Sequence, residues 1–208
     1  MKKIVNVAVV IMFSLAASVT VHAQRGDTKF NLNYNYSMPI GSFKNDIISD
    51  GSPRGATGDI MYNFSNKISG GIGFGYQDYY QKYPRTTYKT GDNETTSAVL
   101  SNSIQAVPIM AKLAFKPLGT RGAVQPYLTG GAGVSLIGFK QYLGEFGSAD
   151  NSASFAAQAG AGVFIPFGKL SAAGLSLGAN YNYVPYNKNG FGNMNTLDLH
   201  AGIYFPLR

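Results

Sequence analysis

The last part of the chain, residues 195–208, alternates between apolar and mixed side chains along its whole length. The apolar residues occupy every second position: Leu197, Leu199, Ala201, Ile203, Phe205 and Leu207. A period of two places them on one face of a β-strand, with Asp198 and His200 on the other. The same alternation recurs through most of the chain. The fold must therefore cover the apolar faces of many strands, either with a protein core or with lipid.

The start of the chain has the features of a secretory signal peptide. Lys2 and Lys3 form a basic segment, and residues 4–21 are mostly apolar and carry no charge. Small residues at Val21 and Ala23 mark a cleavage site. We predict a cleaved signal peptide at residues 1–23 and one mature domain at residues 24–208. A transmembrane anchor is the alternative, but polar residues dilute the apolar run.

The composition favours a membrane barrel over a soluble globular domain. Charged residues make up 13% of the chain, against about 25% in soluble domains. The chain has 26 Gly, 14 Tyr and 13 Phe, and no segment after residue 23 is long and apolar enough for a transmembrane helix. It has no Cys, which excludes disulfides and a lipid-anchored lipoprotein. Lys and Arg are scattered, so no nucleic-acid partner is expected.

Period-two alternation predicts eight strands, at residues 27–38, 55–64, 67–77, 99–115, 126–137, 152–165, 173–184 and 195–208. In the first of them Asn31, Asn33 and Asn35 alternate with large apolar side chains, and such a polar face suits a water-filled lumen better than a protein core. Pro108 falls inside the fourth strand and predicts a bulge there. Alternating glycines in the third strand indicate a crowded lumen, since no helix follows to complete a nucleotide-binding loop.

The connections between these strands alternate in length. Residues 39–53, 78–97, 138–151 and 185–194 form long connections, and the others are shorter. This pattern predicts an all-β fold: an eight-stranded antiparallel up-and-down transmembrane β-barrel with both mature termini in the periplasm. A soluble lipocalin-like barrel is the alternative fold, and it would turn its apolar faces inward around a ligand.

The end of the chain carries a further pattern. His200, Gly202, Phe205 and Leu207 follow the order polar-x-Gly-x-x-aromatic-x-apolar, which resembles the closing-strand signal that outer-membrane barrels present to their assembly machinery; here Arg208 extends one residue beyond it. With the Pro-Ile-Gly-Ser-Phe and Pro-Tyr-Leu stretches at 39–43 and 126–128, the mature chain resembles the OmpA/OmpX-type family of small outer-membrane barrels. This resemblance implies a monomer in the outer membrane of a Gram-negative-type cell, with outer-membrane lipid, lipopolysaccharide and the barrel-assembly machinery as partners.

Few residues could support catalysis or metal binding. His200 is the only histidine of the predicted mature chain, and Cys is absent, so neither a multi-histidine metal site nor Cys/His catalysis fits within one chain. Lipid-deacylating outer-membrane enzymes have a Ser two residues after their His, where this chain has Gly202. We therefore predict no cofactor, no metal and no enzymatic activity, and a lipid-modifying enzyme is the least favoured function.

Two groups of residues are candidates for function. The connection at 78–97 is rich in tyrosine and charge, which suits contact with an amphipathic partner or with lipopolysaccharide phosphates; its candidates are Tyr79, Tyr80, Lys82, Tyr83, Arg85, Tyr88 and Lys89. The alternative is that its tyrosines belong to the aromatic girdle and its charges are only solvated. Strand parity places a second group inside the lumen: Asp59, Lys112, Asp198 and His200.

The lumen candidates predict a filled interior. An eight-stranded barrel is only wide enough inside for side chains, and an unpaired charge there is costly. We predict that Lys112 bridges to Asp59 or Asp198, provided that no bulge at Pro108 turns Lys112 outward. The expected function is a structural or surface-interaction role, in which extracellular loops meet an unidentified outside partner. A small porin-like channel for small solutes is the alternative.

Overall fold

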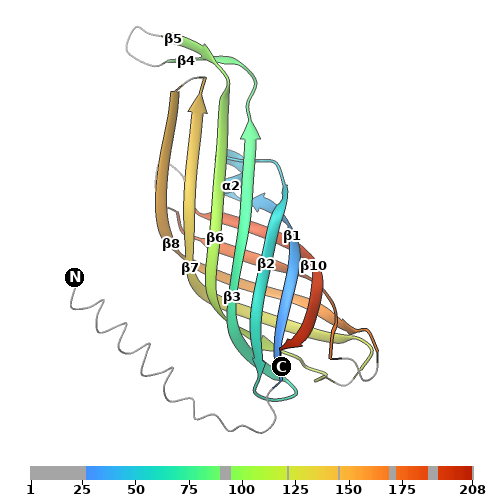
Figure 1. The fold of residues 1–208 in the computed structure, drawn as a ribbon. Coiled ribbons are helices and arrows are strands. Elements are labelled where there is room, and N and C mark those ends of the chain that lie inside the picture. Colours follow the sequence, from blue (N-terminus) through green and yellow to red (C-terminus); the bar gives the residue numbers. More distant parts are fainter. Residues whose placement is uncertain are drawn as a thin grey trace, which may run out of the picture.

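The computed structural model describes residues 27–89, 95–120, 122–144, 146–168, 172–186 and 192–207. Within these residues eight antiparallel strands close into one barrel, in the order β1-β10-β9-β8-β7-β6-β3-β2 (Figure 1). The strands are β1 (Thr28–Ile40), β2 (Ser52–Asn63), β3 (Ile68–Lys82), β6 (Leu100–Phe115), β7 (Gln125–Leu143), β8 (Phe146–Pro166), β9 (Gly174–Val184) and β10 (Met194–Leu207). The predicted all-β up-and-down barrel is confirmed. The predicted signal peptide lies outside the described residues.

Two small elements lie in the connections. Helix α2 (Ser42–Asp46) follows β1, and a hairpin of β4 (Thr86–Lys89) and β5 (Thr95–Ala98) joins β3 to β6. In the described residues no helix has the length and apolarity needed to span a membrane. We call the end where β1 begins and β10 finishes the lower end of the barrel, as drawn in Figure 1, and the end that carries α2 and the hairpin the upper end.

The barrel turns its apolar side chains outward and its polar side chains inward. Large apolar residues on the outer face are widely exposed, as Leu113 is at 64%, whereas Asn33, Asn35 and Ser37 of β1 are buried in the lumen. An apolar belt of this kind needs lipid as its solvent. The predicted facing of the strands is therefore confirmed, and the lipocalin-like alternative, with apolar residues inside, is wrong.

The predicted bulge at Pro108 is not present. β6 pairs with β7 in one register from Leu100 to Phe115, and the pairs of β3 with β6 keep the same offset on both sides of Pro108. Pro108 fits because Gly75 lies opposite it on β3, where a Cβ would come within 3.1 Å of the proline ring. Lys112 consequently faces the lumen. The one shift in register with β1 lies between Asn35 and Ser37, where β1 pairs with β2.

The long connection predicted at residues 138–151 is wrong. β7 continues to Leu143 and β8 begins at Phe146, and the two strands pair without interruption from the turn to Gln125 and Phe164. Gly144 takes a left-handed conformation, with φ of 62°, as tight hairpin turns require. β3, β6, β7 and β8 therefore rise above the rest of the barrel (Figure 1).

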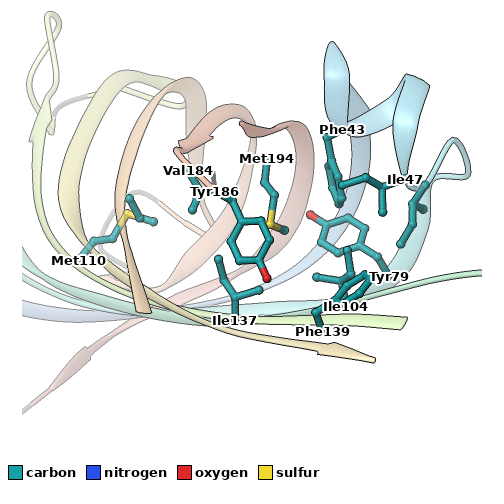
Figure 2. Packing of buried hydrophobic residues seen from close by; sticks show 12 residues of the cluster. Phe43, Ile47, Tyr79, Ile104, Met110, Ile137, Phe139, Val184, Tyr186 and Met194 are labelled. Atoms are coloured by element: carbon teal, nitrogen blue, oxygen red, sulfur yellow. The ribbon is translucent and has the colours of Figure 1, made fainter. Parts of the chain in front are cut away.

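A compact apolar cluster closes the upper end. Residues 41–51, which contain helix α2, are called the α2 segment. Its Phe43 and Ile47 pack against Tyr79, Ile104 and Phe139, which point inward from the raised strands (Figure 2). The Phe43 and Tyr79 rings meet edge to face, with centroids 5.2 Å apart. The Tyr83 hydroxyl donates to the Ile47 carbonyl oxygen at 2.6 Å. The segment after β1 is thus packed and hydrogen-bonded over the upper opening of the lumen.

Candidate functional site

Of the two predicted partners of Lys112 in the lumen, Asp59 rather than Asp198 forms the ion pair. Lys112 lies on β6 and Asp59 on β2, and the Lys112 ammonium donates to Asp59 Oδ1 at 2.7 Å. Both side chains are largely buried. Gly73 of β3 lies between these strands, and a Cβ there would fall on the two paired side chains. The glycine therefore leaves the space in which the ion pair forms.

Asp198 forms a separate cluster higher in the lumen. Ser37, Asn182 and Thr196 all donate to its carboxylate, with Asn182 Nδ2 at 2.6 Å and Thr196 Oγ1 at 3.1 Å. The Ser37 hydroxyl also lies 2.7 Å from the Tyr79 hydroxyl. The carboxylate is thus held by hydrogen bonds from neutral donors, and no ion pair joins it to Lys112.

His200 takes part in a third polar group, below Asp198. Asn180 Nδ2 lies 3.2 Å from His200 Nδ1, and the Tyr127 hydroxyl lies 2.8 Å from His200 Nε2. When the amide donates to Nδ1, the ring proton sits on Nε2 and donates to Tyr127. The imidazole is buried and both of its nitrogens are occupied.

These polar groups divide the lumen into small spaces. A lower cavity of about 50 Å³ is lined by Lys29, Asp59 and Lys112, among others, and an upper cavity of about 60 Å³ is lined by Tyr79 and Asp198, among others. A water molecule needs about 10–15 Å³ of such space. Each of these two cavities therefore has room for only a few waters.

The residues of the closing-strand pattern lie on both faces of β10. His200 and Gly202 face the lumen, whereas Phe205 and Leu207 face outward. The Phe205 ring packs at a tilt against Phe30 of β1, with centroids 5.3 Å apart. Gly202 has a local reason to be glycine, because a Cβ there would fall on the Leu32 carbonyl and 2.5 Å from Asn33 Oδ1. The role of this pattern in assembly stays a prediction.

We predict that Gly202→Ala lowers the free energy of unfolding by about 1–3 kcal/mol, because the added methyl group overpacks the seam between β1 and β10. Urea titration in detergent micelles, followed by circular dichroism, measures this change. Gly168→Ala is the matched control, since a Cβ at Gly168 meets nothing within 4 Å. Equal free energies of unfolding for the two variants would show that the seam between β1 and β10 accommodates the extra methyl group without strain.

The structure separates the tyrosine-rich candidates of residues 78–97. The assignment of Tyr79 to the loop is wrong, because β3 continues to Lys82. Tyr79 lies on this strand, faces inward and is 3% exposed. Tyr80 and Lys82 point outward from the same strand end, and Arg85 is exposed in the connection. Tyr83 is half-buried, and its hydroxyl donates a hydrogen bond to the Ile47 carbonyl oxygen. Tyr88 and Lys89 belong to β4, and their side chains lie outside the described set.

The raised part of the barrel forms a four-stranded sheet, which we call the protruding sheet. It comprises residues 78–82 of β3, 100–105 of β6, 138–143 of β7 and 146–151 of β8. The pairs that join β2 to β3 stop at Gly55 and Gln77, and those that join β8 to β9 stop at Ala157 and Tyr183. The protruding sheet therefore extends beyond the closed part of the barrel.

The outer face of the protruding sheet carries tyrosines and lysines. Tyr80, Ser103 and Lys140 share one row across the strands, and Lys82, Ser101 and Tyr142 share the next. Strands lie about 4.8 Å apart, so Tyr80 and Lys140 are roughly 10 Å apart. Sequence reasoning misses Lys140 and Tyr142 because it assigns residues 138–151 to a loop. The apolar residues Ile137, Phe139 and Leu143 lie at alternate positions interrupted only by Gln141, and this spacing is the signal that could have found them.

The far strand of this sheet has a free edge. Among the described residues, no strand pairs with residues 146–156 of β8 on the side away from β7. Leu143 and Phe146 are partners at the turn end of this strand pair. In a tight hairpin the residues that flank the turn form a hydrogen-bonded pair, so we expect the backbone groups of Gly147, Ala149 and Asn151 to point to the free side. Such an edge can accept a further strand.

Comparison with known proteins gives a family and a fold. A family model described as outer membrane protein beta-barrel domain matches residues 7–205. No protein with a curated description matches the sequence.

Several solved structures have a similar fold. Neisserial surface protein A has a TM-score of 0.50 and 18% identity, with 88% of this chain and 97% of that chain covered. A major outer membrane protein from Thermus thermophilus has a TM-score of 0.50 and 12% identity, covering 86% and 99%. OprG from Pseudomonas aeruginosa has a TM-score of 0.49 and 14% identity, covering 88% and 97%. At such identities the likeness concerns the fold alone.

Proposed function

Because the chain belongs to the outer membrane protein beta-barrel domain family and is an outer-membrane protein, we propose that it is a surface-interaction protein whose protruding sheet binds a partner protein outside the cell. The observation that carries this proposal is the free edge of β8, raised beyond the closed barrel on a sheet that has its own apolar support. An edge strand presents unpaired N–H and C=O groups, and an extended segment of a partner can pair with them.

The support beneath the sheet favours a preformed binding surface. Ile104, Ile137 and Phe139 face inward from its strands and pack in the cluster that includes Phe43 of the α2 segment (Figure 2). Asn102 Nδ2 donates to the Ile47 carbonyl oxygen at 3.4 Å, and Gln141 Nε2 donates to Asn102 Oδ1 at 3.0 Å. A sheet held in this way loses little conformational freedom when a partner binds.

The lengths of the connections favour an outward-facing protruding sheet. The lower end has short connections, such as residues 64–67, whereas the upper end has residues 41–51, 83–99 and 185–193 as well as the raised strands. Outer-membrane barrels have short turns on the periplasmic side and longer extracellular segments. The upper end therefore faces the outside, and both ends of the barrel domain face the periplasm.

The outer face adds side-chain contacts to the edge. Tyr80 and Tyr142 are about half exposed, and Lys82 and Lys140 lie beside them in the two rows. Tyrosine offers a large amphipathic contact area and is enriched where interfaces bind strongly. Lysines on this face favour a partner segment with acidic residues.

The lumen gives less support to the other functions. The two lumen cavities described above have room for only a few waters each, and the apolar cluster packs at the upper opening, which disfavours a channel. His200 is hydrogen-bonded to Tyr127 and Asn180 inside the lumen, away from the lipid that a lipid-modifying enzyme would attack. We therefore propose a non-enzymatic role.

A pair of prolines tests the edge directly. Proline removes the backbone N–H, and it is tolerated at edge positions where that N–H faces solvent. We predict that Ala149→Pro with Asn151→Pro reduces the adhesion of cells carrying the protein to the level of a deletion strain. Adhesion to the surface that the parent strain colonises is measured by plate counts, with heat-modifiable gel migration as the check on folding.

Threonines at the same two positions are the matched control, because they keep both N–H groups on a β-compatible backbone. The threonine variant is expected to adhere as the parent does. Equal adhesion of the proline and threonine variants would contradict binding at the edge. Equal adhesion of the parent and the deletion strain would contradict the surface-interaction role itself.

A further inference from the structure

Two lysines lie close together at the lower mouth of the lumen. Lys29 faces inward from β1, and Lys116 follows the last residue of β6. The Lys29 ammonium lies 5.0 Å from the centre of the Tyr204 ring, and the Lys116 ammonium lies 5.6 Å from the centre of the Phe164 ring. The two rings meet edge to face, with centroids 5.0 Å apart. A pair of touching aromatic rings thus forms one wall beneath two cations.

Neither lysine has an acidic partner in contact. In the described residues the ion pairs join Arg54 to Asp78 and Lys112 to Asp59. Lys116 is 4% exposed, and its ammonium donates to the amide oxygen of Asn63 at 2.9 Å. Asp27 is exposed just before β1 and forms no ion pair with Lys29.

The surroundings of Lys116 are unfavourable to its charge. Burial, and to a lesser extent the neighbouring charge of Lys29, lowers the pKa of Lys116 to about 8. A buried cation costs free energy unless a counter-charge lies near it. Lys29 is half-buried and faces the same cavity, and its acidic neighbour Asp27 is exposed and forms no ion pair with it, so the two ammonium groups concentrate positive charge at this mouth.

Both lysines line the lower cavity, which provides room for a small occupant. Its volume is about 50 Å³, and Asn63, Ser69, Gln125 and Tyr127 also line it. These side chains can donate hydrogen bonds to an oxygen atom. Asp59 lines the same cavity, but Lys112 neutralises its charge at 2.7 Å. The net field in the cavity therefore favours a negative ligand.

We propose that the lower mouth of the lumen is a binding site for a small oxyanion, a phosphate or carboxylate group, held between Lys29 and Lys116. The aromatic wall of Phe164 and Tyr204 fixes the two ammonium groups by cation–π contact. The oxyanion receives charge-assisted hydrogen bonds from both lysines. The site lies at the opposite end of the barrel from the protruding sheet, so its test does not depend on the proposed surface interaction.

Titration of the lysine signals tests this site. The mature chain is prepared in detergent micelles with ¹³Cε-labelled lysine and titrated with inorganic phosphate, and separately with acetate. The Lys29 and Lys116 signals, identified by their loss in Lys29→Met and Lys116→Met, are expected to shift and saturate together. Saturation with phosphate alone identifies a phosphate ligand, and saturation with both anions shows that a carboxylate is also accepted.

The variants sharpen the test. Lys116→Met is expected to weaken binding at least tenfold, as loss of one charge-assisted hydrogen bond of roughly 1.5–3 kcal/mol implies. Lys67→Met, in the exposed turn between β2 and β3, should leave binding unchanged. Lys116→Gln serves if the methionine variant fails to fold. Unsaturable shifts with both anions, or equal weakening by Lys67→Met, would overturn the proposal.

Discussion

Replacing Lys112 with methionine is expected to lower the free energy of unfolding of the barrel by about 3 kcal/mol. Methionine keeps the apolar stem of the lysine but leaves the Asp59 carboxylate without its ammonium partner, which lies at 2.7 Å in the unmodified protein. A buried charge that loses its partner is strongly destabilising. Because the chain has no Trp, urea unfolding in micelles is best followed by circular dichroism.

The double variant Asp59→Asn with Lys112→Met separates charge from packing. It removes both charges, so most of the lost stability should return. Together with the Asp59→Asn single variant, it completes a double-mutant cycle that gives the coupling energy of the pair. Lys140→Met is the control, because Lys140 is exposed on the outer face of β7 and should change stability by no more than about 0.5 kcal/mol. A similarly small effect of Lys112→Met would show that lumen water already solvates Asp59.

The facing of the strands could be predicted from the sequence because lipid and lumen impose opposite demands on alternate residues. In β6, Leu113 faces lipid and Lys112 faces the lumen, and both follow from period two. The ion-pair partner of Lys112, however, could only be narrowed to Asp59 or Asp198. Alternation along a strand predicts whether a side chain faces the lumen or the lipid. Its position along the barrel axis depends on the registers of all eight strands, which the alternation does not give.

The protruding sheet could not be predicted because the polarity of its two faces is reversed. Within the membrane β7 turns Val134 outward and Ser135 inward, whereas above it the strand turns Lys140 outward and Phe139 inward. Water replaces lipid outside, and a protein core replaces the polar lumen inside. Polar and charged residues consequently appear at positions where a membrane strand would be apolar, and the segment resembles a loop.

The α2 segment and the proximity of Lys29 to Lys116 could not be predicted from the sequence, for other reasons. Helix α2 has five residues, which is too short for a helical period to be recognised. The inward side of Lys29 follows from the alternation of β1, but Lys116 lies beyond the end of its strand, where alternation no longer applies. Their proximity depends on the closure of the barrel, which brings β1 and the end of β6 to the same mouth.

The second large effect is expected for Phe43→Ala, which should open the α2 segment without unfolding the barrel. Phe43 is 1% exposed and packs edge to face on Tyr79. Removal of a buried phenylalanine costs about 3–5 kcal/mol. Residues 41–51 are joined to the rest by this cluster, by hydrogen bonds to Ile47, and by hydrogen bonds of Ser42 with Asn193 and of Ser49 with Gln81. Because none of these contacts belongs to the pairing of the barrel strands, the cost should fall on local opening.

Hydrogen exchange and trypsin cleavage both report that opening. The amides of Ile47 and Ile48 donate to the Phe43 carbonyl oxygen, and a loss of about 3 kcal/mol makes their exchange roughly 100-fold faster. Trypsin should then cleave after Lys44, which is exposed on the same helix, while circular dichroism shows an intact barrel. Lys44→Ala, the control for exchange, should leave the amides protected. If Phe43→Ala instead lowers the stability of the whole barrel by the full amount, the α2 segment and the strands unfold as one cooperative unit, and the upper closure is part of the barrel core rather than a separate cover over it.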